Sequence, residues 1–169
     1  MNQTIIGIYT APGPGEKMIS HEEGVLEAGK GVVGDRYYEA IGTFTKNADE
    51  TGDHEVTLVE SEEIDRFNAD HDLSFNYGAF RRNLITQGVR LNDLVGQEFR
   101  IGSLKLAGIR LCEPCAWLAE LLVPEVLSSM VGRCGLRARI VEGGRLQVGE
   151  SIETSLSGPS GTTHSPGGE

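Results

Sequence analysis

The stretch LVGQEFRIGSLKLAGIRLCEPC occupies residues 94–115. Its apolar residues surround a Gly102-Ser103 turn, which predicts two short strands joined tightly. The second strand leads into a loop that contains Pro114 and ends at Cys115. The residues that follow, AWLAELL at 116–122, have helical spacing. We therefore expect Cys115 at a junction between a strand and a short helix.

Cys115 is the side chain in this stretch that is best suited to chemistry. A thiol just before a helix lies near free backbone N–H groups and the positive end of the helix dipole, which lower its pKa. The resulting thiolate could ligate a soft metal or carry a sulfane sulfur. The alternative is a buried packing cysteine.

The other two cysteines carry weaker signals. Cys112 forms a Cys-x-x-Cys pair with Cys115, but one such pair is weak evidence for zinc, and no thioredoxin-like pattern surrounds it. Cys112 could be a resolving thiol or a packing residue. We expect Cys134 to pack near a turn.

Short elements also fill the rest of the chain. Further strands are expected at residues 3–10, 56–59 and 83–86, and a closing hairpin from 137–141 and 145–148. Helical spacing recurs at residues 61–67 and 125–130. With 23 glycines, this pattern predicts a mostly β fold, a β-barrel with a few short helices and not a doubly wound sheet.

The domain prediction is one folded unit followed by a tail. Residues 1–18 form an opening strand and a Pro/Gly turn that belong to the same fold as residues 19–153. Residues 46–55 are polar and acidic, which indicates an exposed loop. Residues 154–169 are rich in Ser, Thr, Gly and Pro, and such a segment cannot bury enough apolar surface to order itself.

Composition narrows the class of partner. The chain has 15 basic and 25 acidic residues and a formal net charge of −10, so we expect neither nucleic acid nor an anionic membrane as a partner. Three cysteines do not suit a disulfide framework, and no signal peptide or bilayer-spanning run is visible. We therefore expect a cytoplasmic protein with reduced thiols.

Three glycine- and arginine-rich blocks stand in a fixed order along the chain. The first is GVVGDRY at residues 31–37, and the second runs from GAFRRNL at 78–84 through residues 94–102 to Cys115. The third begins with GRCGLRAR at 132–139 and ends with GGRLQVGE at 143–150. Together they resemble the MOSC family, the C-terminal domain of molybdenum-cofactor sulfurases, which also occurs as small stand-alone bacterial proteins.

The resemblance implies a pyruvate-kinase-like β-barrel and a functional cysteine, which Cys115 matches by position. It also implies molybdenum cofactor (molybdopterin) as a ligand, with molybdenum on Cys115. Looser associations are metal–sulfur cluster assembly and pyridoxal phosphate binding. The positions that match cofactor-binding residues are Arg36, Arg82, Asn83, Arg133 and Arg137.

The side-chain chemistry agrees with these positions. Molybdenum and sulfane sulfur both require a polarizable thiolate, and an arginine fork suits phosphate or a pterin edge. Arg81 and Arg82 are adjacent, so on a strand only one would face a given pocket, and we expect it to be Arg82. Arg36 is either a ligand or the partner of Asp35 in a turn. Trp117 is expected in the core.

Three hypotheses follow. In the first, Cys115 carries a persulfide, received from a cysteine desulfurase or another sulfur donor, or binds the molybdenum cofactor. In the second, the bound molybdenum reduces N-hydroxylated compounds. In the third, the chain is a noncatalytic β-barrel that binds a small anionic ligand or a partner, and Cys115 is structural.

Overall fold

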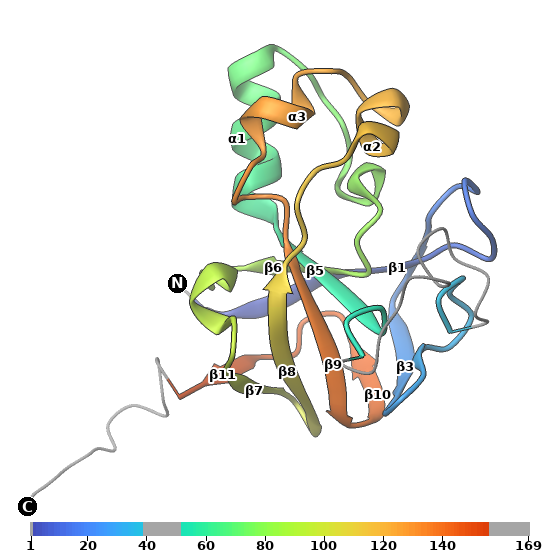
Figure 1. Ribbon diagram of the computed structural model, residues 1–169. Helices are drawn as coiled ribbons and strands as arrows, with labels where there is room; N and C mark the ends of the chain where they lie inside the picture. The colour runs from blue at the N-terminus through green and yellow to red at the C-terminus, as the bar shows by residue number, and fades with distance from the viewer. Residues whose placement is uncertain (1, 39–51, 156–169) are drawn as a thin grey trace, which may run out of the picture.

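The computed structural model describes residues 2–38 and 52–155 of the chain. Most of the acidic segment 46–55 and of the tail 154–169 therefore lies outside the described residues. The described part consists mainly of strands with a few short helices (Figure 1). The mostly β class predicted from the sequence is confirmed.

Eleven strands of the described residues form two sheets. The larger sheet has the order β11 (Ile152–Thr154), β7 (Glu98–Ile101), β8 (Leu104–Leu111), β9 (Leu136–Glu142), β5 (Val56–Glu60), β6 (Leu84–Gln87), β1 (Thr4–Thr10) and β2 (Ile19–His21). The smaller sheet has the order β10 (Gly144–Gln147), β3 (Glu23–Glu27) and β4 (Gly31–Val32). Only β5 and β6 pair in parallel; the other pairs are antiparallel.

The larger sheet is not closed into a barrel, which corrects that detail of the prediction. Its ladder ends at β11 and β2. The edge of β1 nevertheless meets the segment that leads into β11, since Ile5 N donates to Glu150 O at 3.0 Å and Gly149 N donates to Ile5 O at 2.7 Å. The sheet thus curls round an apolar interior without a continuous ring of strand pairs.

The expected closing hairpin is wrong. The strands β9 and β10 do form, but β10 pairs with β3 in the smaller sheet. Both edges of β9 are already occupied, by β5 on one side and β8 on the other. β10 therefore has no free edge of β9 to bind.

Helices gather beyond one end of the larger sheet, at the top of Figure 1. They are α1 (Ser61–His71), α2 (Ala116–Leu121), α3 (Val126–Ser129) and the 3₁₀ helix η2 (Tyr77–Phe80); a second 3₁₀ helix, η3 (Leu91–Leu94), precedes β7. Phe67, Phe80, Leu118 and Val126 join a buried apolar cluster beneath them. In the described residues no helix is both long and apolar enough to cross a membrane.

A second cluster fills the interior of the curled sheet, with Leu58, Leu106 and Leu136 from the larger sheet and Leu26 and Leu146 from the smaller one. All five side chains are at most 1% exposed. The two clusters lie on either side of β5 and β6, which contribute alternate residues to each. The strand ends between the clusters are where polar side chains meet.

Gly108 provides a test of this packing. A Cβ there would lie 2.1 Å from the carbonyl oxygen of Leu94, at a point where the register of β8 shifts. We expect Gly108→Ala to lower the free energy of unfolding by about 3 kcal/mol, in the range of severe packing substitutions. Urea unfolding measures this loss.

Gly96→Ala is the matched control. Gly96 has φ +78° but open space around its Cβ position, so only the cost of a left-handed alanine applies, about 1 kcal/mol. Equal losses in the two variants would contradict the close approach of Gly108 to Leu94.

Candidate functional site

A pocket lies where β8 ends, where the chain leaves β4 and where η2 passes into β6. Four arginines, two cysteines and two aromatic residues line it: Arg36, Arg81, Arg82, Arg137, Cys112, Cys115, Tyr37 and Trp117, with Thr57 and Leu118. Its cavity measures about 30 Å³, room for about two water molecules. The structure thus brings Cys115 together with three of the predicted arginines and with Arg81.

Cys115 is the most accessible of the three thiols. It is half-buried, whereas Cys112 and Cys134 are 2% and 1% exposed, and all three are free. Its backbone is extended, with φ −134° and ψ 168°, and it directly precedes α2 as predicted. The thiol therefore lies at the strand–helix junction, open to the pocket.

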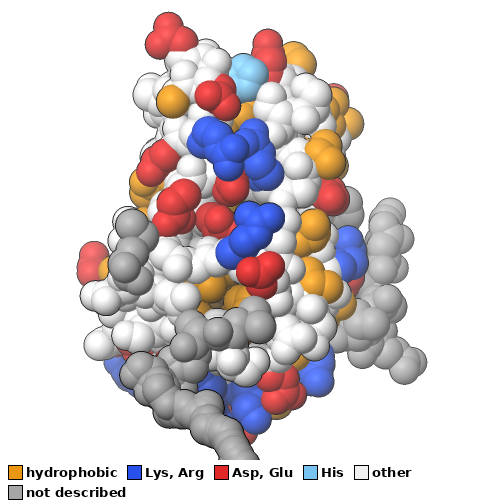
Figure 2. Space-filling view, turned by 90° about the vertical axis from the view of Figure 1, so that its left-hand side faces the viewer, with side chains coloured by type: hydrophobic (Ala, Val, Ile, Leu, Met, Phe, Trp, Pro, Cys, Tyr) orange, Lys and Arg blue, Asp and Glu red, His pale blue; other side chains and the backbone are white. Residues whose placement is uncertain are grey.

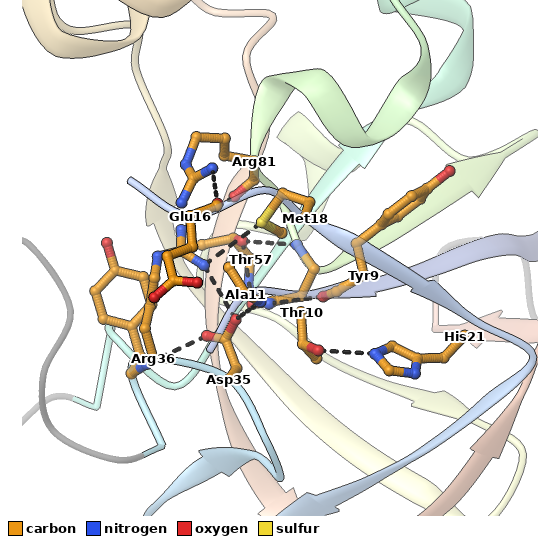
Figure 3. A network of polar contacts seen from close by, with 12 residues as sticks. Tyr9, Thr10, Ala11, Glu16, Met18, His21, Asp35, Arg36, Thr57 and Arg81 are labelled. Carbon is orange, nitrogen blue, oxygen red and sulfur yellow. Dashed lines mark hydrogen bonds and ion pairs between the residues drawn. The ribbon is translucent and has the colours of Figure 1, made fainter. Parts of the chain in front are cut away.

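Arg36 is held by the carboxylate of Asp35, which is fully buried (Figure 3). Asp35 Oδ1 accepts from Arg36 Nη1 at 3.0 Å and from the Ala11 backbone N–H at 3.0 Å, and Oδ2 accepts from Tyr37 N at 3.3 Å. The turn pairing and the pocket position, which the sequence offered as alternatives, thus coexist. Arg36 also stacks on the ring of Tyr37 at 4.5 Å.

Arg81 is the residue that sequence reasoning missed. It caps the 3₁₀ helix η2 with φ 64° and ψ 29°, a left-handed conformation. The alternation of an extended strand does not apply there, so Arg81 and Arg82 line the same pocket. The expectation that only Arg82 would face it is wrong, because neither arginine lies on a strand: β6 begins at Leu84.

Arg81 is fixed by contacts with the backbone and with an aromatic ring. Its Nη1 donates to Glu16 O at 2.7 Å (Figure 3), and its guanidinium lies 5.1 Å from the centre of the Trp117 ring. Trp117 is half-buried at the pocket and not enclosed in the core as expected. Burial, followed by the charge of Arg36, lowers the pKa of Arg81 from its ordinary value.

Arg82 connects the cysteine segments. Its Nε donates to Cys134 O at 2.9 Å, and its Nη2 lies 3.1 Å from Cys134 Sγ and 3.5 Å from Cys112 O. Burial alone lowers the pKa of Arg82, but the surrounding cysteine sulfurs, Cys112 and Cys134 foremost, raise it on balance. Burial also raises the pKa of the Cys134 thiol.

Arg137 reaches the pocket from β9, where it stands opposite Thr57 in the pairing of β5 with β9. Its Nη1 donates to Asp53 O at 3.4 Å. It is therefore placed by a central strand of the sheet and not by a loop.

Asn83 and Arg133 do not line the pocket. Asn83 Oδ1 accepts from Thr57 N at 3.1 Å, and its Nδ2 donates to Tyr9 O at 3.1 Å, so it ties β5 to β1. Arg133 donates to Ser129 O and lies 3.5 Å from Glu63. Neither residue therefore shares the pocket with Cys115.

The pocket is basic in a chain that is acidic as a whole. Within the described residues neither Arg81 nor Arg82 pairs with a carboxylate, while Arg36 pairs with Asp35. On the face shown in Figure 2, by contrast, Lys and Arg side chains stand among Asp and Glu in separate groups. A thiol beside such arginines can bind or transfer anionic groups.

Among residues 2–38 and 52–155, no group of three or more His, Cys, Asp or Glu side chains could hold a metal ion. A metal at the pocket would rely on Cys115 and on ligands that its own cofactor brings.

Comparisons with known proteins address the family and the fold. The model of the MOSC domain matches residues 29–153. The chain is similar in structure to the YuaD protein from Bacillus subtilis, with TM-score 0.76 and 16% identity, over 90% of this chain and 95% of that one. No curated protein matches.

Two further solved structures share the fold. YiiM from Geobacillus stearothermophilus has TM-score 0.67 and 15% identity, over 94% of this chain and 77% of that one. YiiM from Escherichia coli has TM-score 0.66 and 19% identity, over 91% and 69%. At these identities the likeness shows the fold alone.

Thiol accessibility yields the first prediction for the site. Cys112 and Cys134 are buried, and burial also raises the pKa of the Cys134 thiol, so neither sulfur is open to an alkylating reagent in the folded protein. We expect iodoacetamide to label Cys115 alone in the folded protein and all three cysteines in denaturant, as read by peptide mass spectrometry. Equal labelling of Cys134 in the folded state would contradict this arrangement.

A second prediction separates the structural and chemical roles. Asn83→Ala leaves the buried N–H of Thr57 without its acceptor, which costs about 2 kcal/mol of unfolding free energy. Cys115→Ala removes one half-buried atom and should cost less than about 1 kcal/mol. Chemical unfolding of both variants decides whether Asn83 and not Cys115 supports the fold.

Proposed function

This chain belongs to the MOSC domain family, and we propose that it acts as a sulfur carrier whose Cys115 holds a persulfide. The observation that carries the proposal is the half-buried Cys115 thiol in a pocket lined by four arginines. A persulfide is an anion at neutral pH, and guanidinium groups stabilise it by charge-assisted contacts.

The three cysteines have different parts in this proposal. Cys115 is reachable from the pocket, so a cysteine desulfurase or another donor would deliver sulfur to it. Cys134 and Cys112 are covered, and Arg82 holds the backbone of both. These contacts fix the loop that presents Cys115, so Arg82 acts as a positioning residue.

Molybdenum cofactor is the second candidate ligand, favoured by unpaired guanidinium nitrogens. Among residues 2–38 and 52–155, Arg36 Nε and Arg81 Nε and Nη2 have no hydrogen-bond partner, which suits a phosphate or another oxyanion. A Cys115 thiolate suits molybdenum. When bound, the cofactor would supply the redox chemistry for reducing N-hydroxylated compounds. A cavity of about 30 Å³ does not enclose a pterin, which favours the carrier role.

The noncatalytic alternative differs in its thiol. An anion-binding module needs the arginines but not a reactive Cys115, so Cys115→Ala would leave its binding unchanged. Pyridoxal phosphate is less well supported, since among the described residues no lysine lines the pocket to form a Schiff base.

Intact-mass and metal analysis of freshly purified protein tests the proposal. After incubation with a cysteine desulfurase and cysteine, we expect the wild type to gain the mass of one sulfur atom, removable by a reducing agent. Cys115→Ala should gain none, and the matched control Cys112→Ala should still gain it.

The remaining outcomes separate the candidates. In the first, protein purified from a host that makes the cofactor contains stoichiometric molybdenum, and Cys115→Ala does not. That result would support the cofactor role in place of the carrier role. If Cys115 holds neither sulfur nor molybdenum, the carrier role and the cofactor role are both contradicted, and the noncatalytic module remains.

A further inference from the structure

Two arginines in the pocket are buried although some of their guanidinium nitrogens have no hydrogen-bond partner among the described residues. Arg36 is 3% exposed and Arg81 is 7% exposed. Yet Arg36 Nε and Arg81 Nε and Nη2, all buried, have no hydrogen-bond partner within the described part of the chain. Buried polar groups in native proteins are nearly always paired, and each exception calls for an explanation. A ligand that accepts several hydrogen bonds would supply one.

The charges at the pocket point to an anion. Asp35 pairs with Arg36 and also serves two backbone N–H groups, while Arg81 and Arg82 have no carboxylate partner among the described residues. The pKa of Arg81 is lowered, by burial first and by Arg36 next. An anion between these guanidinium groups would offset both effects.

The size and the neighbours of the pocket define the anion further. The space of about 30 Å³, about two water molecules, is small and favours a small anion over a nucleotide or a pterin. Cys115 lines the same space. An oxyanion bound there would therefore meet a sulfur nucleophile.

We infer that the pocket binds a small sulfane-sulfur oxyanion of the thiosulfate class as the sulfur donor of Cys115. This inference rests on the proposed carrier function and names its substrate. The arginines bind the sulfonate oxygens, and the outer sulfur of the donor faces the thiol.

The transfer is balanced without an oxidant. The Cys115 thiolate attacks the outer sulfur of thiosulfate and forms the S–S bond of a persulfide. The original S–S bond breaks, and its electron pair leaves with sulfite. The thiol proton has passed to solvent beforehand. A thiol or cyanide acceptor then attacks the outer persulfide sulfur and restores the Cys115 thiolate.

Trp117 offers a direct readout of binding, because it is the one tryptophan of the chain and lies 5.1 Å from the Arg81 guanidinium. We expect thiosulfate and sulfate to change Trp117 fluorescence saturably, and chloride at equal ionic strength not to. Arg81→Gln should weaken binding about tenfold, the loss of one charged hydrogen bond.

Matched variants separate binding from folding and transfer. Arg145→Gln is the control arginine, because Arg145 pairs with Glu23 on the surface and is not a pocket residue; its binding should equal that of the wild type. Cys115→Ser should keep the fluorescence change and lose sulfur transfer. Arg81→Lys keeps the charge and should retain more affinity than Arg81→Gln. It also serves as the second variant if Arg81→Gln folds poorly.

Transfer is read by intact mass and by sulfite. With thiosulfate as the donor, Cys115 should gain one sulfur while one equivalent of sulfite is released. If a desulfurase loads Cys115 but thiosulfate neither loads it nor changes Trp117 fluorescence, the inference fails and the carrier function stands. If neither donor loads Cys115, both fail.

Discussion

Arg36, Arg81 and Arg82 are buried together at one pocket, and this concentration of positive charge is the constraint on which the site depends. Like charges repel at short range, and burying a charge is costly unless it is paired. Asp35 neutralises Arg36, while backbone carbonyls of Glu16 and Cys134 hold the other two. An anionic ligand would complete the arrangement, which connects its electrostatics to the chemistry proposed for Cys115.

The ends of the strands, and the segments that connect them to the next element, place these groups. Thr57 and Arg137 stand opposite each other on β5 and β9, and Cys112 N donates to Gly135 O where β8 ends and β9 begins. Asn83 fastens β5 to β1 beside them. The apolar helical layer then covers the strand ends and sets α2, with Cys115 before it, at the pocket. Fold and site are thus consequences of the same strand pairings.

Local patterns predicted much of this arrangement. The alternation of apolar residues over 94–111 predicted two strands, and the spacing after Cys115 predicted a helix. Both patterns depend only on residues that are close together in the sequence. Partner choice is a long-range property, so the pairing of β10 with β3 instead of β9 was not visible. The left-handed backbone of Arg81 was also hidden, since arginine rarely adopts it, and with it the fourth pocket arginine. Trp117 was misplaced for a related reason: its contact partner is Arg81.

Family resemblance and physical reasoning converged on Cys115, Arg36, Arg82 and Arg137, which share the pocket. Asn83 and Arg133 were predicted with them but do not line the pocket, because a matching position carries no information about hydrogen bonds. Each of those side chains is engaged within the fold, one between strands and one at the end of α3. The position of a residue in the sequence therefore indicated that it lies near the site, while the role of its side chain became clear only from its contacts.

The positive charge of the pocket arginines is tested most directly by measuring the thermal unfolding midpoint as a function of sulfate concentration at constant ionic strength. A ligand that binds only the folded state stabilises it by about 2.7 kcal/mol at one hundred times its dissociation constant. We predict a saturable rise of the midpoint with sulfate, reduced in Arg81→Gln. Identical midpoints in sulfate and chloride would contradict an anion site in this pocket.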